Sequence, residues 1–212
     1  MRNRTEWFDN ATVDSLARGV EQVVIVGAGY DGRALRFNTK AVRWIEVDHP
    51  ATQVDKQQRV HGLGVDVGHI TFAAVDLVRD DIDAALDRAG HQSDVATLFM
   101  CEGLLGYLPV ETIVSVFTVL RRRSTPESAL AANFRVTTEP RWLGEHLAGA
   151  VLDGMLKLVG ETRLTEFHEG DPERLLSEAG WVIQRRATAD QTWLDGGSRG
   201  VLVLAAPRDD LP

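Results

Sequence analysis

The chain has 212 residues, which at about 150 residues per domain predicts one domain with a sizeable core. Hydrophobic residues make up 44% and charged residues 25%, a globular average that excludes disordered, collagen-like and coiled-coil chains. The net charge of −8 has the wrong sign for coating nucleic acid or an anionic membrane. We therefore expect a globular protein without a nucleic-acid or membrane partner.

The amino terminus and the cysteine content both indicate the compartment. Residues 1–7 lack the apolar core of a secretory signal, and no apolar run approaches the roughly 18 residues of a membrane span. The single cysteine, Cys101, cannot form an intrachain disulfide and is expected to be a small buried residue. No His or Cys cluster has metal-ligand spacing. We expect a soluble, cytoplasmic protein without a metal site.

Short apolar runs rich in β-branched residues recur along the chain and predict seven strands. They lie at residues 22–26, 42–47, 70–75, 96–101, 129–136, 181–186 and 200–205. The sequence Asp195-Gly196-Gly197-Ser198 between the last two favours a hairpin, and hence one antiparallel strand.

Helical patterns alternate with these strands. Pro109 suits the first position of a helix over 109–121, whose apolar residues share one face. A second helix has Asp171 as its expected cap, Pro172 in its first turn and Gly180 as its left-handed exit. The alternation predicts an α/β protein with a doubly wound, seven-stranded, mostly parallel sheet. Ligands of such sheets bind at the carboxyl ends of the strands.

A glycine-rich loop follows the first predicted strand. Gly27-Ala28-Gly29-Tyr30-Asp31-Gly32 has the spacing that lets the backbone approach a nucleotide, with a tight turn that binds nothing as the alternative. Asp31 places a carboxylate where the pyrophosphate of a dinucleotide would lie. Only nine residues separate Gly32 from Val42, so the helix after the loop must be short. Both features argue against NAD.

Carboxylates follow four of the predicted strands. Asp31 follows the first, Glu46 and Asp48 end the second, and the third and fourth are followed by Asp76 and Glu102. S-adenosylmethionine carries a sulfonium cation, an ammonium group and two ribose hydroxyls, all of which favour carboxylate partners, and it has no phosphate. The acidic strand ends therefore favour S-adenosylmethionine over NAD.

Each of these carboxylates has a structural alternative. Asp48 fits a ribose contact or a cap of the helix that follows it. Asp76, followed by Leu77, fits an adenine site or a turn. Glu102 fits the aminoacyl end of the cofactor or a charge at a helix start.

Five segments, in their order and spacing, resemble the leucine carboxyl methyltransferase family, including its bacterial branch of S-adenosylmethionine-dependent methyltransferases. None is specific singly, but together they are specific, and they are spread from residue 4 to residue 108. They are RTEWFD (4–9), QVVIVGAGYD (22–31), EVDHP (46–50), VDL (75–77) and EGLLGYL (102–108).

The resemblance implies a class I methyltransferase sheet, which is Rossmann-like, and activity as an S-adenosylmethionine-dependent methyltransferase (EC 2.1.1). It places Arg4 at the methionyl carboxylate of the cofactor, with a solvated surface charge as the alternative. Phe8 and Asp9 would belong to a helix beside the glycine loop. The implied cofactor contacts are Arg4, Gly27, Gly29, Asp48, Asp76, Leu77 and Glu102.

The chain departs from the family pattern at Gly32, where members usually have Thr, and at Glu6, where they have a second arginine. Most members also have several tens of residues before the arginine motif, which help to cover the active site. We therefore keep open a cofactor-binding remnant without catalytic activity.

The family name implies a small-molecule acceptor with a carboxylate, which attacks already ionised; a hydroxyl acceptor would need a base. Residues 137–170 are longer than a simple connector and are a candidate substrate-side insertion in a single domain, 1–212. Within it, Trp142 and His146 lie one helical turn apart and are candidate pocket residues, as is Tyr107; packing or solvation is their alternative. His49 is a candidate base or a turn residue.

Three functional hypotheses follow. The leading one is an S-adenosylmethionine-dependent O-methyltransferase acting on a carboxylate or hydroxyl of a small molecule. The second is an NAD-binding oxidoreductase that uses the same glycine loop. The third is the noncatalytic remnant. The sequence assigns neither a catalytic residue nor an oligomeric state.

Overall fold

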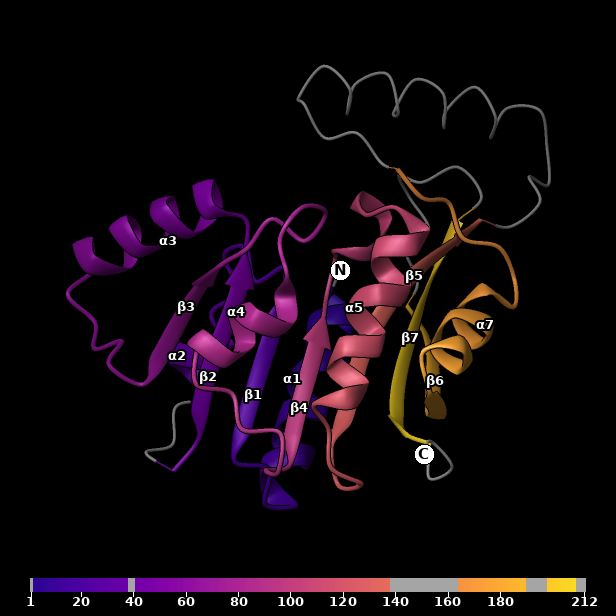
Figure 1. Ribbon diagram of the computed structural model, residues 1–212, viewed down its shortest axis with the longest axis horizontal. Helices are drawn as coiled ribbons and strands as arrows, with labels where there is room; N and C mark the ends of the chain where they lie inside the picture. Colours follow the sequence, from indigo (N-terminus) through magenta and orange to yellow (C-terminus); the bar gives the residue numbers. More distant parts are fainter. Residues whose placement is uncertain (1, 38–40, 138–163, 190–197, 209–212) are drawn as a thin grey trace.

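The structure is a computed structural model that describes residues 2–37, 41–137, 164–189 and 198–208. Seven strands form one sheet in the order β3-β2-β1-β4-β5-β7-β6 (Figure 1). The strands are β1 (Gln22–Val26), β2 (Arg43–Asp48), β3 (Ile70–Ala74), β4 (Thr97–Cys101), β5 (Ala129–Thr137), β6 (Trp181–Ala189) and β7 (Ser198–Pro207).

All seven predicted strands are confirmed, with shifts at their ends. The first five pair in parallel, whereas β7 runs antiparallel to both β5 and β6. The predicted antiparallel hairpin is therefore also confirmed. A register shift between Ile183 and Arg185 accompanies the extension of β6 beyond its predicted end.

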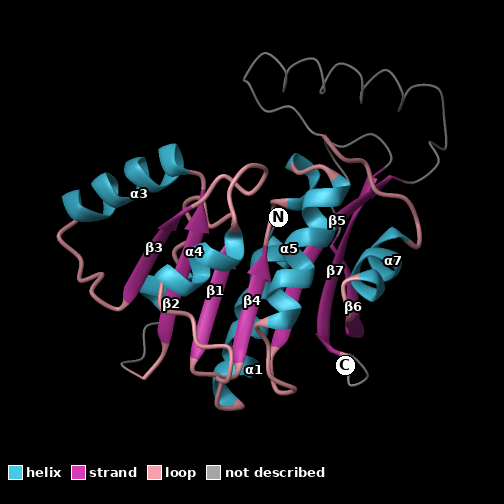
Figure 2. Ribbon diagram, viewed as in Figure 1, coloured by secondary structure: helices cyan, strands magenta, loops and turns pink. Residues whose placement is uncertain are grey.

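Helices cover both faces of the sheet (Figure 2). The described helices are α1 (Arg2–Ala17), α2 (Arg33–Arg36), α3 (Pro50–Gly62), α4 (Ile82–Arg88), the 3₁₀ turn η1 (Leu105–Tyr107), α5 (Val110–Arg122) and α7 (Asp171–Glu178). None of them is long and apolar enough to cross a membrane.

Two predicted helix starts need correction. Pro109 has extended ψ and precedes α5, which begins at Val110, so it is the cap and not the first helical residue. Asp171 is the first residue of α7 and its carboxylate accepts the His168 N–H outside the helix, while Gly170 occupies the cap position. Gly180, with φ +81°, is the left-handed exit as predicted.

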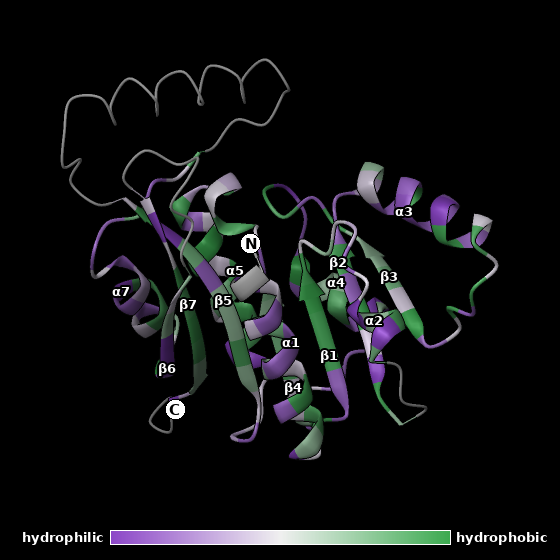
Figure 3. Cartoon of the chain, turned by 180° about the vertical axis from the view of Figure 1, so that it is seen from behind, coloured by the Kyte–Doolittle hydropathy of each residue, from purple (hydrophilic) through white to green (hydrophobic). Residues whose placement is uncertain are grey.

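The alternation of side chains along each strand divides the core into two layers. On β1, Val24 and Val26 pack with the residues of α4, α5 and α7, whereas Val23 and Ile25 pack on the other face with α1 and α2. The buried strands are accordingly strongly apolar in the view from behind (Figure 3). Because β1 to β4 are parallel, their carboxyl ends meet at one edge of the sheet, the upper edge in Figure 1.

A buried histidine lies between the sheet and α4. The Nε2 atom of His91 is 3.2 Å from Thr97 Oγ1, and its ring centroid is 5.6 Å from that of Phe99. The pKa of His91 is lowered to about 4, chiefly by burial and also by Arg123 and Arg43, while Asp87 opposes this shift. The imidazole is therefore neutral in the folded protein at pH 7.

This histidine predicts a pH-dependent stability. The unfolded chain binds a proton at His91 near pH 6.5, whereas the folded chain does so only near pH 4, so stability falls as the pH falls between these values. Linkage gives a loss of about 3 kcal/mol between pH 7 and pH 4. His91→Gln should remove this component in urea unfolding at the two pH values. An equal loss of stability in the variant would contradict the assignment.

Candidate functional site

The glycine loop at the end of β1 is fastened to β2 by its own backbone. The N–H groups of Gly27 and Ala28 donate to Val47 O at 2.8 and 3.1 Å. Gly27 has φ +69°, and a Cβ there would lie 2.8 Å from the Leu104 side chain, so only glycine fits. Gly29 has φ +47°, and a Cβ there would meet nothing within 4 Å. The loop is thus packed on one side and open on the other.

Asp48 closes this loop from the end of β2. One carboxylate oxygen accepts the Gly29 N–H, and the other accepts the His49 N–H at 2.6 Å. The predicted alternative, that Asp48 caps the next helix, is wrong, because His49 occupies that position and its Nδ1 accepts the Ala51 N–H. His49 therefore acts as a helix cap, a role that the sequence did not predict for it.

At the end of β3, Asp76 organises its own loop. Its Oδ1 accepts the Val78 N–H at 3.0 Å, and Arg79 Nε lies 3.7 Å from Oδ2. Leu77 is partly buried against the sheet core. Asp76 thus has the geometry of a turn residue, which was the alternative to an adenine contact. It follows β3 at the same edge of the sheet as Asp48.

Glu102, after β4, lies between two arginines. Arg4 Nε donates to Oε1 at 2.8 Å, and Arg33 Nη1 is 2.7 Å from Oε2. Glu102 therefore binds two arginine side chains. It does not cap a helix, because the residue that precedes η1 is Leu104. The adjacent Gly103 N–H donates to Asn133 Oδ1 at 2.6 Å, which joins this loop to β5. Arg4 is a paired and partly exposed charge.

Arg33, which the sequence interpretation did not select, connects three carboxylates. Besides Glu102, it pairs with Asp31 and, through Nε at 2.7 Å, with Asp9 of α1. Its side chain is only 3% exposed, and its guanidinium lies over the Phe8 ring. The desolvation of Arg33 is outweighed by Asp31, Glu102 and Asp9, which raise its pKa. The expected packing of Phe8 and Asp9 beside the loop is confirmed.

Asp9 also binds Arg36, whose Nη1 is 2.6 Å from Oδ2. Desolvation of Asp9 is outweighed by Arg36 and Arg33, which lower the pKa of its carboxyl. The described charges at this junction are therefore three arginines, Arg4, Arg33 and Arg36, against three carboxylates, Asp9, Asp31 and Glu102. Several acidic residues at neighbouring strand ends indicate that cationic side chains lie between them, and this pattern could have led to Arg33.

Glu46 is not part of the exposed acidic edge, and its predicted place there is wrong. Its side chain is 1% exposed within β2 and lies 2.5 Å from Lys56 Nζ of α3, which also donates to Asp31 O at 2.8 Å. Burial raises the pKa of Glu46, and Lys56 opposes this shift. Glu46 and Asp48 lie two residues apart and therefore on the same face of β2. Glu46 is further from the carboxyl end of the strand, where Lys56 and Gln53 of α3 bond it.

The segment that returns from the candidate insertion packs on η1. The N–H groups of Leu164 and Thr165 donate to Gly106 O at 2.9 and 3.2 Å, and Thr165 Oγ1 donates to Leu108 O at 2.6 Å. Tyr107 lies beside this contact and is partly exposed. Trp142 and His146 lie outside the described residues.

Cys101 is fully buried, as expected, and burial raises the pKa of its thiol to about 12. Within the described ranges, no group of three His, Cys, Asp or Glu side chains could hold a metal ion.

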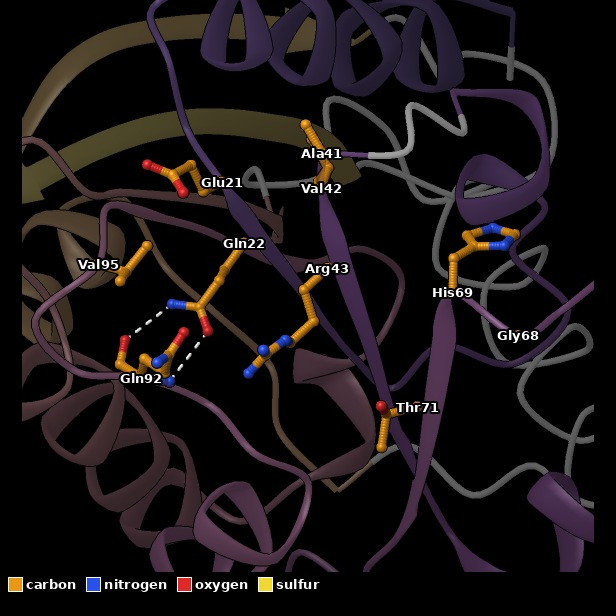
Figure 4. Close-up of a pocket in the computed structure, with 10 residues that line it drawn as sticks. All are labelled: Glu21, Gln22, Ala41, Val42, Arg43, Gly68, His69, Thr71, Gln92 and Val95. Atoms are coloured by element: carbon orange, nitrogen blue, oxygen red, sulfur yellow. Dashed lines mark hydrogen bonds between the residues drawn. The ribbon is translucent and has the colours of Figure 1, made fainter.

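A polar hollow of about 350 Å³ lies at the opposite, amino edge of β1, β2 and β3 (Figure 4). Gln22 and Gln92 bond each other across it, at 2.8 and 2.9 Å. Arg43 of this hollow donates to Gly90 O. This hollow lies at the opposite edge of the sheet from the Arg33 cluster and shares no residue with it.

The strand order, with an antiparallel β7 inserted between β5 and β6, defines a class I methyltransferase fold. The profile of the family called leucine carboxyl methyltransferase matches residues 1–121, and the chain belongs to this family.

Relatives share its sequence over most of its length. It is 32% identical over 199 residues to a "Putative S-adenosyl-L-methionine-dependent methyltransferase" of Mycolicibacterium smegmatis, with 89% of this chain and 62% of the relative covered. A protein of the same description in Mycobacteroides abscessus is 35% identical over 205 residues, with 96% and 62% covered. The chain thus spans less than two thirds of the length of these relatives.

Solved structures support the fold. Magnesium protoporphyrin IX methyltransferase of Synechocystis PCC 6803, solved with bound SAH, has a TM-score of 0.61 at 16% identity, covering 96% of this chain and 83% of that one. Mitomycin 7-O-methyltransferase has a TM-score of 0.59 at 16% identity, covering 89% and 49%.

The buried Glu46–Lys56 pair generates a prediction about stability. Lys56→Met leaves a buried carboxylate without its partner, which should lower the free energy of unfolding by about 3–5 kcal/mol. Adding Glu46→Gln to Lys56→Met should restore a large part of the lost free energy of unfolding, because the unpaired buried charge is then absent. Both are measured by urea unfolding.

Arg59→Met is the matched control, because Arg59 lies on the same helix in an exposed pair with Asp55. It should leave the unfolding midpoint close to that of the wild type. The account of the pair fails if Lys56→Met behaves like the control.

Proposed function

We propose that this chain binds S-adenosylmethionine at the carboxyl edge of β1 to β4 and transfers its methyl group to a carboxylate or hydroxyl of a small molecule. The observation that carries the proposal is the contact between Asp48 and the Gly29 N–H. It sets a carboxylate from β2 beside the open side of the glycine loop, where ribose hydroxyls would find both an acceptor and space. Family membership supports the same cofactor.

The other residues at this edge fit the remaining parts of that cofactor. Glu102 and Arg4 offer one negative and one positive partner, which match the ammonium and carboxylate of an amino acid. Asp76 and Leu77 would accept the exocyclic amine and pack against the adenine ring. Gly27 and Gly29 would lie beneath the cofactor. A phosphate-free, zwitterionic ligand therefore suits this donor set.

The alternative, an NAD-binding oxidoreductase, is less compatible with the loop. The N–H groups of Gly27, Ala28 and Gly29 are already bonded to β2 residues. The helix that follows, α2, has four residues and offers no developed helix start to a pyrophosphate. Asp31, by contrast, is balanced by Arg33, so its charge no longer argues against phosphate by itself.

In the proposed mechanism the cofactor supplies a methyl group activated by a sulfonium. The residues of the chain would hold and orient the cofactor: Asp48 would bind the ribose, and Glu102 with Arg4 would bind the aminoacyl end. An acceptor carboxylate needs no base, because it is ionised at pH 7. We propose Tyr107 as a contact of the acceptor, with Trp142 and His146, which lie outside the described residues, as further candidates.

Titration calorimetry with S-adenosylmethionine and its demethylated product tests the cofactor. Asp48→Ala should weaken binding by about 2–4 kcal/mol, because hydrogen bonds to a charged group are lost. NAD should give no heat with the wild type. Transfer of a radiolabelled methyl group to a panel of small acids and hydroxylated compounds then tests catalysis.

Asp66→Asn is a matched control, because the Asp66 carboxylate also accepts a backbone N–H, that of Gly68, in the loop before β3. Its affinity for the cofactor should equal that of the wild type. The absence of heat with either form of the cofactor would overturn the proposal, and cofactor binding without methyl transfer to any compound of the panel would favour the noncatalytic remnant.

A further inference from the structure

We propose that Arg33 is a positioning residue for the aminoacyl end of the cofactor, acting through Glu102; the inference rests on the proposed function. Arg33 holds Oε2 of Glu102 from the buried side at 2.7 Å. Oε1 is left on the more exposed side, where it meets Arg4. The two oxygens therefore have different roles, one anchored in the protein and one presented to the site.

The burial of the two arginines separates their functions. The Arg33 side chain is 3% exposed and held by Asp9, Asp31 and Glu102, whereas that of Arg4 is 30% exposed and pairs with Glu102. Arg33 cannot leave to meet a ligand without removing the arginine partner of Asp31 and one of the two arginines that pair with Asp9 and with Glu102. Arg33 therefore serves as the fixed counter-charge, and Arg4 is the arginine that can exchange Glu102 for the carboxylate of a ligand.

Arg33 also connects α1, the glycine loop and Glu102, which carry the groups that would bind the aminoacyl end. Its Nη2 donates to Thr5 O of α1 at 3.3 Å, one residue after Arg4. Its backbone N–H donates to Asp31 Oδ1 at 2.7 Å, within the glycine loop. One guanidinium thus sets the spacing of Arg4, the loop and Glu102.

Two ligands distinguish positioning from simple support of the fold. S-adenosylhomocysteine carries the aminoacyl group, whereas 5′-methylthioadenosine retains the adenosine part and lacks the ammonium and carboxylate. In calorimetry, Arg33→Gln should weaken S-adenosylhomocysteine about tenfold or more and change 5′-methylthioadenosine less than about twofold. In an Glu102→Gln background, the added Arg33→Gln should have little further effect, because Arg33 acts through that carboxylate.

Arg36→Gln is the matched control, since Arg36 is on the same helix and shares Asp9 but does not reach Glu102. It should leave both affinities unchanged. Arg33→Lys retains a charge with fewer donors and should weaken S-adenosylhomocysteine selectively, which keeps the test valid if Arg33→Gln does not fold.

Equal weakening of both ligands in folded Arg33 variants, or unchanged affinity for S-adenosylhomocysteine, would overturn the positioning role. If the wild type itself binds neither ligand, the proposed function fails, and the positioning role fails with it. The two failures are therefore distinguishable by the wild-type titration.

Discussion

The ion-pair cluster around Arg33 is the interaction on which the carboxyl edge depends. Parallel strands bring their carboxyl ends together, and this chain places acidic residues at several of them. Carboxylates that approach one another in a partly buried place repel unless a cation lies between them. Arg33 supplies that cation, because it pairs at once with Asp9 of α1, Asp31 of the loop and Glu102 after β4.

A second cation, Lys56, stabilises the neighbouring part of the same edge. It pairs with the buried Glu46 and donates to the backbone oxygen of Asp31, so that α3, β2 and the loop are tied together. With these charges paired, Asp48 is partly exposed at the carboxyl edge, and Glu102 is held between Arg4 and Arg33.

The fold could be predicted from the sequence, because its strands and helices are encoded by patterns of neighbouring residues. Apolar β-branched runs predicted every strand, and the turn residues before β7 predicted its antiparallel direction. Asp48, Asp76 and Glu102 were correctly expected at the carboxyl ends of β2, β3 and β4, because the ends of parallel strands meet at one edge. Arg33 and Lys56 were missed. Arg33 lies 24 residues from Asp9 and 69 residues from Glu102 in the sequence, and Lys56 lies on a helix whose packing against β2 the periodicity does not specify. The burial of Glu46 could not be predicted from the sequence, because it depends on how α3 packs against β2.

The central claim is that this edge holds the cofactor with Glu102 anchored by Arg33. A crystal structure of the chain with S-adenosylhomocysteine tests it most directly. The account predicts ribose hydroxyls on Asp48, the ammonium group on Glu102 Oε1, and an intact bond between Arg33 and Oε2. Ligand bound at another place, or Glu102 turned away from Arg33 in the complex, would contradict the account.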